Sequence, residues 1–476
     1  MEYGFLTLAA PILALAVAIV TRKVPLAMLI GIFTGQMIIC GWNPFIAIHE
    51  GVNVIIGVCT DAGNLKTFMF TALMGAFVIL VRVSGGVQGF VNYLTEQSKL
   101  VKSKRMAMFL AFIIGVIIFI DGLLSIMFTG VVTRPLTDKF KVSREKLAYI
   151  CDATSAPINA IIPLNSWGAM LMGLISAEIA SGYIQGNPMN LLVSSLPFQF
   201  YSILSLVFVL FYIFIGKDWG PMKKAELRVQ TTGKLYDDGV VPLLNDTDGF
   251  EVLVEEGKEN KWNMMLPLIT LIGGTFLGLL VTGGGNLTEG DGTTSILYSV
   301  TVTLIIMCIM YTKQGLMTTK EFGDSVMKGI SNMMGLVILL VLSFAIGRVI
   351  KGMGTGEFMA SLLGENVSGA FCAAIVFLLG AIMAFCTGTS WGTFSIMMPI
   401  AIPMAVAMDG NILLTIGAVV SSGIFGDHCS PLSDTTILSS MSVGTDLFSH
   451  VKTQLPYALL TAALATTLYV VFGFVL

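Results

Sequence analysis

The amino-acid sequence predicts an all-α polytopic membrane protein, built from two inverted repeats that each hold one re-entrant helical hairpin and one broken transmembrane helix. Hydrophobic residues make up 55% of the chain and charged residues 12%, and the mean hydropathy is +0.86. Soluble globular domains are far more polar than this. Apolar runs long enough to cross a hydrocarbon core of about 30 Å recur along the chain, and polar groups interrupt some of them at corresponding places in the two halves.

Membrane spans are predicted where the sequence stays largely apolar for roughly 17–22 residues. These runs lie near residues 4–21, 25–41, 67–83, 148–175, 197–216, 263–282, 295–312, 332–350 and 456–476. The first run follows Glu2 and precedes Arg22 and Lys23, whereas a cleaved secretory signal carries its positive charge ahead of the apolar run. We therefore expect a retained helix with its N-terminus outside the cell. The more mixed segments 43–60, 88–97 and 320–332 are predicted to be amphipathic helices at the membrane interface.

Two further regions do not fit simple spans. The region 106–135 is bracketed by two basic clusters, 99–105 before it and 134–146 after it. If both clusters are cytoplasmic, this region enters and leaves on one face, as a hairpin with Asp121 and Gly122 near its tip. The region 369–408 has almost no flanking charge and carries a Thr-Gly-Thr-Ser sequence at its centre, and it is predicted to be a second hairpin that enters from the opposite face.

The distribution of basic residues supports this topology. All but Lys66, Arg348 and Lys351 of the 26 Lys and Arg residues fall on the cytoplasmic side, which is the bias expected of a correct orientation. Making either hairpin a full span would reverse every later loop and remove the bias. The long polar segment 217–262 is predicted to be a cytoplasmic linker without chemistry of its own, between a first repeat at 1–216 and a second at 263–476.

The two halves contain matching interruptions. The Asp-Ala-Thr-Ser-Ala-Pro sequence at 152–157 corresponds to Asp-His-Cys-Ser-Pro at 427–431, so broken helices are predicted near 148–175 and 411–440. The first half starts outside and the second starts inside, which makes the repeats inverted. Secondary transporters commonly have this plan and hold substrate and ion near the midplane, at the repeat interface.

The interrupted segments contain carboxylates and hydroxyls, the hard oxygen ligands that suit an alkali cation. An ionisable residue at membrane depth is by default a functional candidate. We predict a Na⁺ site at Asp427 and Asp434, where a proton and Na⁺ compete for a carboxylate. The predicted cation- and proton-binding residues are Asp427, Asp434, Ser430, Thr435, Thr436, Asp152 and Asp121.

A substrate site is predicted beside the cation site, because hairpin tips and helix breaks expose backbone amides that hold a carboxylate. Its candidate residues are Thr387, Thr389, Ser390, Trp391, Thr154, Ser155, Asn159, Asn165, Ser166 and His428. Structural alternatives remain open for six of the residues named in this and the preceding paragraph. Asp434 could cap a helix, Asp152 could pair with the nearby basic cluster, and His428 could be a satisfied core histidine. The two Ser-Trp-Gly sequences, which contain Ser166, Ser390 and Trp391, could serve close helix packing.

Other classes of function find no support in the sequence. It contains no GxSxG, P-loop or HExxH motif, so no enzyme activity is predicted. The seven cysteines mostly lie singly in apolar runs without a CxxC pair, which indicates neither disulfides nor a metal cluster. No cofactor and no nucleic acid partner are expected; the expected partners are the lipid bilayer, Na⁺ as coupling ion, and H⁺.

The run Gly-Asp-His-Cys-Ser-Pro-Leu-Ser-Asp-Thr-Thr-Ile-Leu-Ser-Ser at 426–440 resembles the signature of the NhaC-type Na⁺/H⁺ antiporter family, and 134–157 is similar to its first-half motif. The resemblance extends over nearly the whole chain. It implies a Na⁺- or H⁺-coupled carrier in a cell membrane, with two hairpins and a transport domain that moves against a dimeric scaffold. One departure is Asp121-Gly122-Leu123, where family members carry two adjacent acids before an aromatic residue.

The expected function is therefore a secondary active transporter, a Na⁺/H⁺ antiporter in the plasma or inner membrane that forms a homodimer. The alternative is a Na⁺- or H⁺-coupled carrier of a small organic solute such as an amino acid or a mono- or dicarboxylate, because the resembling family includes such carriers. A channel is less favoured, since inverted broken segments suit alternating access.

Overall fold

The computed structural model describes residues 3–21, 23–96, 101–119, 121–236, 259–286, 290–355, 358 and 368–476, and within these ranges the regular elements are all helices. Of the described helices, ten are long and apolar enough to cross a membrane, and a further pair is bent. The helices of the first half are α1 (Ala9–Thr21), α2 (Val24–Ile39), α3 (Pro44–Cys59), α4 (Ala62–Val83), α5 (Gly86–Glu96), α6 (Lys104–Ile117), α7 (Gly122–Lys139), α8 (Arg144–Ile161), α9 (Ser166–Ala180), α10 (Pro188–Ser195) and α11 (Phe200–Ile215). Those that follow are α12 (Gly220–Thr232), α13 (Trp262–Thr282), α14 (Gly292–Lys313), α15 (Thr319–Gly352), α17 (Cys372–Thr387), α18 (Ser390–Ala407), α19 (Ile412–Cys429), α20 (Asp434–Val443) and α21 (Leu447–Val475).

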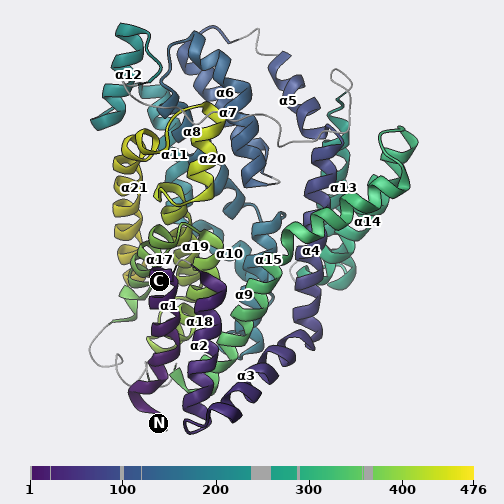
Figure 1. The fold of residues 1–476 in the computed structure, drawn as a ribbon, viewed down its shortest axis with the longest axis vertical. Coiled ribbons are helices and arrows are strands. Elements are labelled where there is room, and N and C mark those ends of the chain that lie inside the picture. Colours follow the sequence, from purple (N-terminus) through teal and green to yellow (C-terminus); the bar gives the residue numbers. More distant parts are fainter. Residues whose placement is uncertain are drawn as a thin grey trace.

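The same order of helices occurs twice. In the first half the pair α6 and α7 precedes α8 and α9, which are bent by 45° at their break. In the second half α17 and α18 precede α19 and α20, which are interrupted between Cys429 and Asp434. Figure 1 shows α6 and α7 near the upper end and α18 in the lower half, an arrangement that inverted repeats require. The predicted helix breaks are present, and the re-entrant nature of the two hairpins stays a prediction.

One predicted boundary is absent. The segment 320–332 is not a separate interfacial helix, because α15 runs without interruption from Thr319 to Gly352. A capping box of Thr318 and Glu321 starts it. Its first half lies against α4, where a Cβ on Gly329 would be 2.4 Å from the Gly75 carbonyl oxygen, and this close packing holds the stretch 320–332 within the helix.

Part of the predicted linker is helical. Helix α12 is tied to the starts of α6 and α8 by ion pairs: Glu226 to Lys104, and Arg228 to Glu145 at 2.8 Å. Just before α12, Asp218 pairs with Lys146 at 2.7 Å. Residues 237–258 of the linker, together with Arg22 and Lys99 of the predicted cytoplasmic clusters, lie outside the described residues.

Helices α1 and α2 form a third antiparallel pair that lies against α18 and α15. Figure 1 shows both in the lower half, close to α3 and the N-terminal end of the chain. The start of α2 packs closely on α18, because a Cβ on Gly392 would be 2.4 Å from a methyl group of Val24. Val24, the first residue of α2, therefore lies beside the start of α18.

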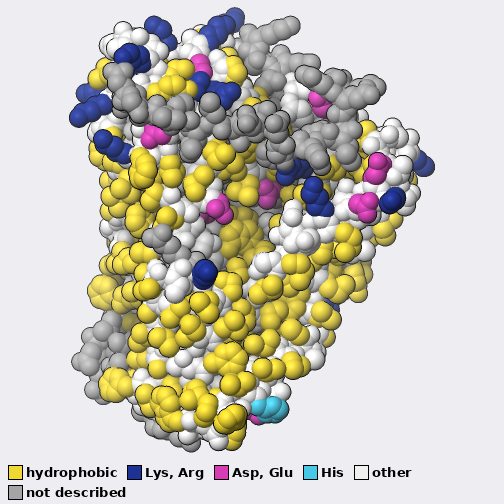
Figure 2. Space-filling model, viewed as in Figure 1, with side chains coloured by type: hydrophobic (Ala, Val, Ile, Leu, Met, Phe, Trp, Pro, Cys, Tyr) yellow, Lys and Arg dark blue, Asp and Glu magenta, His cyan; other side chains and the backbone are white. Residues whose placement is uncertain are grey.

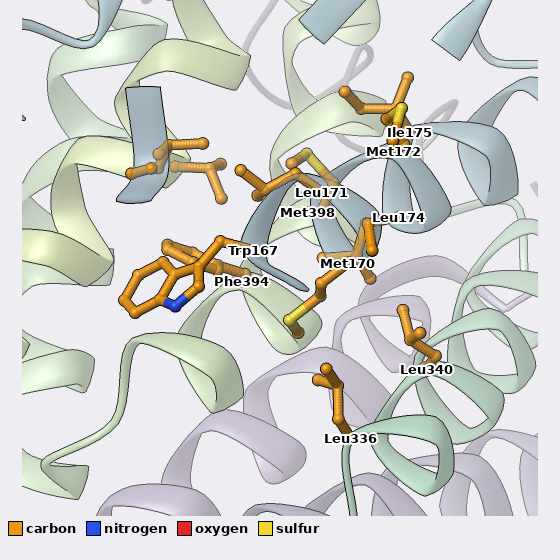
Figure 3. Packing of buried hydrophobic residues seen from close by; sticks show 14 of the residues in the cluster. Trp167, Met170, Leu171, Met172, Leu174, Ile175, Leu336, Leu340, Phe394 and Met398 are labelled. Carbon is orange, nitrogen blue, oxygen red and sulfur yellow. The ribbon is translucent and has the colours of Figure 1, made fainter. Parts of the chain in front are cut away.

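The two halves share one apolar core. The Trp167 ring of α9 lies 5.1 Å from the Trp391 ring and 6.0 Å from the Phe394 ring of α18, measured between centroids. Figure 3 shows Trp167 and Phe394 together, with Met170 and Met398 nearby. On the visible face in Figure 2 hydrophobic side chains form a broad belt, and Lys and Arg gather above it. That the end with the basic residues is cytoplasmic, and the N-terminus outside, stays a prediction.

Candidate functional site

Helices α8 and α19 carry the two buried carboxylates of the molecule's polar centre, and prolines free a backbone carbonyl in each. Pro431 cannot donate to the Asp427 carbonyl, and the Thr436 hydroxyl donates to it instead at 3.1 Å. Pro157 likewise frees the Ala153 carbonyl, which accepts from the Ser205 hydroxyl at 3.3 Å. The sequence therefore builds a polar interior at the helix breaks, with side chains replacing the lost backbone bonds.

Asp427, near the end of α19, lies beside the tip of the second hairpin. Its carboxylate accepts a hydrogen bond from the Ser390 hydroxyl at 2.9 Å, and another from the Ser433 hydroxyl. Ser390 is the first residue of α18, and Ser433 caps the N-terminus of α20. Asp427 is 4% exposed, so the start of α18 and the break between α19 and α20 converge on one buried carboxylate.

Asp152 comes from the other half and meets this cluster. Its Oδ2 atom accepts from the Thr436 hydroxyl at 3.3 Å and from the Gln454 amide at 2.9 Å. The Asp152 and Asp427 carboxylates are near enough to repel each other when both are ionised. Thr436 thus bridges the two halves, because its hydroxyl contacts the Asp152 carboxylate and the Asp427 carbonyl.

Two residues of this cluster, Gln454 and His450 of α21, are absent from the sequence prediction. The Gln454 amide also donates to the His428 carbonyl, and its oxygen lies 2.8 Å from Nε2 of His450. His450 Nε2 lies 3.9 Å from Oδ2 of Asp152. Their spacing of four residues puts both on one helix face, and two buried polar side chains on one face of an apolar helix are the signal that would have indicated them.

The second predicted Na⁺ ligand, Asp434, lies apart from this network. It is exposed in the first turn of α20, where a negative charge favours the helix dipole, although it is near enough to interact electrostatically with Asp427. Thr435 contacts Ser433 at 2.9 Å. Ser430 is buried and donates to the Phe385 carbonyl of α17 at 2.7 Å, so it joins two helices.

The tip of the second hairpin brings together several predicted substrate residues. Thr389 caps α18, accepting from the Gly392 amide at 3.4 Å, and Ser390 beside it contacts Asp427. Trp391 packs on Trp167. Thr387 ends α17, and its hydroxyl donates to the Met383 carbonyl of the same helix at 2.9 Å. This hydrogen bond is internal to α17.

In the first half, Asn159 and Asn165 shape the break between α8 and α9. The Asn165 amide donates to the Asn159 carbonyl at 3.0 Å and to the Phe119 carbonyl at 3.1 Å, and its oxygen accepts from the Gly168 amide. Asn165 therefore fixes the break against the tip of the first hairpin. The hydroxyls of Thr154 and Ser155 donate to backbone carbonyls of their own helix.

The remaining predicted residues are Asp121, Ser166 and His428. Asp121 caps α7, accepting from the Leu124 amide at 2.9 Å, and it attracts the Arg82 side chain of α4 electrostatically. His428 is buried, and its Nδ1 lies 2.7 Å from the Tyr201 hydroxyl.

Three buried polar atoms of this region have no hydrogen-bond partner among the described residues. They are Oδ1 of Asp152, Oγ of Ser166 and Nε2 of His428. Buried polar atoms are nearly always paired with protein, water or a ligand. The centre therefore has the capacity to bind a cation, a proton or water beyond its internal bonds.

Comparisons with known proteins identify the family of this chain and the proteins that it is similar to. A model of the "Na+/H+ antiporter family" matches residues 164–474. An uncharacterised protein of Haemophilus influenzae is 34% identical over 97% of this chain and 90% of its own length. The "Malate-2H(+)/Na(+)-lactate antiporter" of Bacillus subtilis is 31% identical over 33% of each chain.

The crystal structure of the Alcanivorax borkumensis YdaH transporter superposes with a TM-score of 0.57 at 13% identity, over 90% of this chain and 89% of that one. This similarity establishes a shared fold. The family model covers more than half of the chain, and the chain therefore belongs to the Na⁺/H⁺ antiporter family.

Proposed function

We propose that this secondary transporter exchanges Na⁺ for H⁺ and that Asp427 and Asp152 carry the exchanged ions. The observation that supports this most directly is the Thr436 hydroxyl, which contacts the buried Asp152 carboxylate of one repeat and the backbone carbonyl of the buried Asp427 of the other. A Na⁺ ion at Asp427 would have hydroxyl oxygens of Ser390 and Ser433 beside the carboxylate. Carboxylate and hydroxyl oxygens are hard ligands suited to such a cation.

Electrostatics couples the two ions. Two uncompensated negative charges side by side in a buried site are strongly disfavoured, so one carboxylate holds a proton when no cation is present. A bound Na⁺ supplies the missing positive charge, and the proton is then released. The site therefore holds either Na⁺ or a proton, whichever face of the membrane it is open to. This is the requirement for exchange without leakage.

The geometry also offers a route to alternating access. Asp427 is held by the start of α18, which belongs to the second hairpin, and by the N-cap of α20. A displacement of α17 and α18 would remove Ser390 from the carboxylate and open the site. Location in the plasma membrane and assembly as a homodimer remain predictions.

The test is ²²Na⁺ uptake into proteoliposomes driven by an imposed pH gradient. Asp427→Asn is expected to reduce uptake at least tenfold, the effect of losing about 1.4 kcal/mol of binding free energy, and Asp152→Asn is expected to reduce it similarly. Asp434→Asn is the matched control, because Asp434 is exposed, and it should stay within about threefold of wild type, a difference below 1 kcal/mol. Undiminished gradient-driven uptake by Asp427→Asn would refute the assignment.

A further inference from the structure

A further carboxyl group is buried in the helices, away from the polar centre. Glu178, near the end of α9, is 2% exposed. Its Oε2 atom has no hydrogen-bond partner among the described residues, and no basic side chain of this part of the chain lies within ion-pair distance of it. Glu178 therefore lacks the hydroxyl and amide donors that surround Asp152 and Asp427.

The surroundings of Glu178 are apolar. It follows Leu174 and Ile175 by one helical turn, and Figure 3 shows these two side chains in the packing of α9 near α15 and α18. The Glu178 Oε1 atom lies 3.6 Å from where a Cβ on Gly347 of α15 would be, and the Pro399 Cβ of α18 is equally far from that point. The carboxyl group therefore lies where α9, α15 and α18 meet.

No charged group in the described part of the neighbouring helices compensates Glu178. Helices α10 and α18 contain no titratable side chain. On α15, Arg348 reaches Gly57 of α3, and the Lys351 ammonium lies beside Gly182, beyond the end of α9. The titratable side chains of α4 and α8 do not act on Glu178 electrostatically; they are Lys66, Arg82, Arg144, Glu145, Lys146, Tyr149, Cys151 and Asp152. An unpaired carboxylate in apolar surroundings is strongly disfavoured, and such a group takes up a proton instead.

Helix α18 is weakened where it meets Glu178. Pro399 cannot donate to the Ser395 carbonyl, which accepts from the Ser343 hydroxyl of α15 at 2.7 Å instead. Pro403 likewise leaves the Pro399 carbonyl without its helical donor. Helices bend sharply at such prolines, so α18 can bend here without breaking further backbone hydrogen bonds of its own.

We propose that Glu178 binds a proton and locks the second hairpin: it is neutral while α18 packs on it, and it ionises when α18 moves away and water reaches it. The proton then favours the arrangement in which Ser390, at the start of α18, holds Asp427. A proton that binds one arrangement more tightly shifts the equilibrium toward that arrangement. The lock rests on the hairpin movement of the proposed function, whereas proton binding at Glu178 does not.

The first test is infrared spectroscopy of the full-length protein in lipid at neutral pH, comparing wild type with Glu178→Gln. We expect the difference spectrum to contain the C=O band of a protonated carboxylic acid. Glu50→Gln is the matched control, because the Glu50 side chain is 46% exposed, and its difference spectrum should contain carboxylate bands instead. Glu178→Asp keeps the acid and should shift the band, which provides the same test if Glu178→Gln does not fold. Carboxylate bands assigned to Glu178 would overturn the proposal.

The second test is ²²Na⁺ uptake driven by a pH gradient, measured over a range of Na⁺ concentrations and pH values. Because Gln cannot ionise, Glu178→Gln should lower the maximal rate at least about tenfold. The half-saturating Na⁺ concentration should stay within about threefold of wild type, because Glu178 does not contact the Na⁺ site. Glu178→Asp should transport with a displaced pH profile, and Glu50→Gln should match wild type.

An acid with a purely structural role would leave the rate and the pH profile of Glu178→Gln unchanged, and this result would overturn the lock. If exchange depends on Asp427 and not on Glu178, only this inference fails. If the acid band is present but wild type shows no Na⁺/H⁺ exchange, the proposed function fails and the proton site stands.

Discussion

Thr436 is the residue that joins the two halves beside the buried carboxylates. Its hydroxyl contacts the Asp152 carboxylate of one half and the Asp427 carbonyl of the other. Replacing it by Val keeps the shape and removes the hydrogen bonds. A hydrogen bond to a charged group contributes about 1.5–3 kcal/mol, so we predict that Thr436→Val lowers the apparent Na⁺ affinity by about 10- to 100-fold. The measurement is the Na⁺ concentration that half-saturates gradient-driven uptake.

Two control variants show whether this effect belongs to the hydroxyl. Thr436→Ser retains the hydroxyl and should remain near wild type. Thr461→Val removes a buried hydroxyl that donates only to the Tyr457 carbonyl of its own helix among the described residues, and Na⁺ affinity should not change. Equal affinity in Thr436→Val and wild type would contradict the bridging role.

Individual site residues could be predicted where an ionisable side chain interrupts an apolar run, because placing such a side chain inside the membrane costs free energy. Asp427 and Asp152 belong to this class, and both are buried at the centre. The exposure of Asp434 depends on where α20 begins, since Ser433 rather than Asp434 is the N-cap. A neighbouring hydroxyl and carboxylate are both good caps, so the sequence does not decide between them. Gln454 is neutral and does not stand out in this way, and only its spacing of four residues from His450 on α21 indicates it.

At the scale of the helix, the start of α14 shows how a cap depends on charge. Asp291 accepts from the Thr294 amide at 3.0 Å and lies 3.6 Å from the Lys66 ammonium of α4. Partial burial raises the pKa of Asp291, but the Thr294 hydrogen bonds and Lys66 outweigh it, and its pKa lies below the ordinary value. Ionised Asp291 therefore stabilises the folded protein above its unfolded pKa of about 3.9, and this contribution is lost as pH falls through the lower folded value.

We predict that Asp291→Ala lowers stability at pH 7 by about 1 kcal/mol, the usual effect of removing a cap. Asp291→Asn keeps a capping oxygen and should lose less, because the partner ion pair is half exposed and screened. The gap between wild type and Asp291→Asn should close as pH falls below about 4. Thermal unfolding followed by tryptophan fluorescence across pH measures this. A gap that widens on acidification would mean the Asp291 pKa is raised instead.

Helix breaks were predictable because proline and capping residues cause them locally. Pro431, Asn165 and Ser433 all lie at observed ends or starts of helices. The continuity of α15 was not predictable, since it depends on contact between Gly329 and Gly75 far away in the sequence. The contact of Val24, at the start of α2, with Gly392 is likewise tertiary. Hydropathy alone predicts α1 and α2 to be two ordinary spans with Lys23 on the cytoplasmic side, whereas Lys23 lines a cavity together with Thr389 at the start of α18.

At the scale of the whole molecule, the two hairpins must enter from opposite faces for the site to be reached alternately. The basic clusters around α6 and α7 predict that both ends of this pair are cytoplasmic. The pair α17 and α18 lacks such clusters and is predicted to open outside. This arrangement places Asp121 and Ser390 at the tips of opposed hairpins, one from each side.

Single cysteines in a protein without its seven native ones test this topology. Lys102→Cys and Lys139→Cys flank the first hairpin at exposed positions, and Ser368→Cys precedes the second. A membrane-impermeant maleimide should label the first two only in inside-out vesicles, since both lie within the basic clusters predicted to be cytoplasmic. It should label Ser368→Cys in intact cells, and likewise His49→Cys in α3, which the same predicted topology puts outside. Labelling of Lys102→Cys and Lys139→Cys from opposite sides would make α6 and α7 a full crossing, reverse every later segment, and remove the two-sided access on which exchange depends.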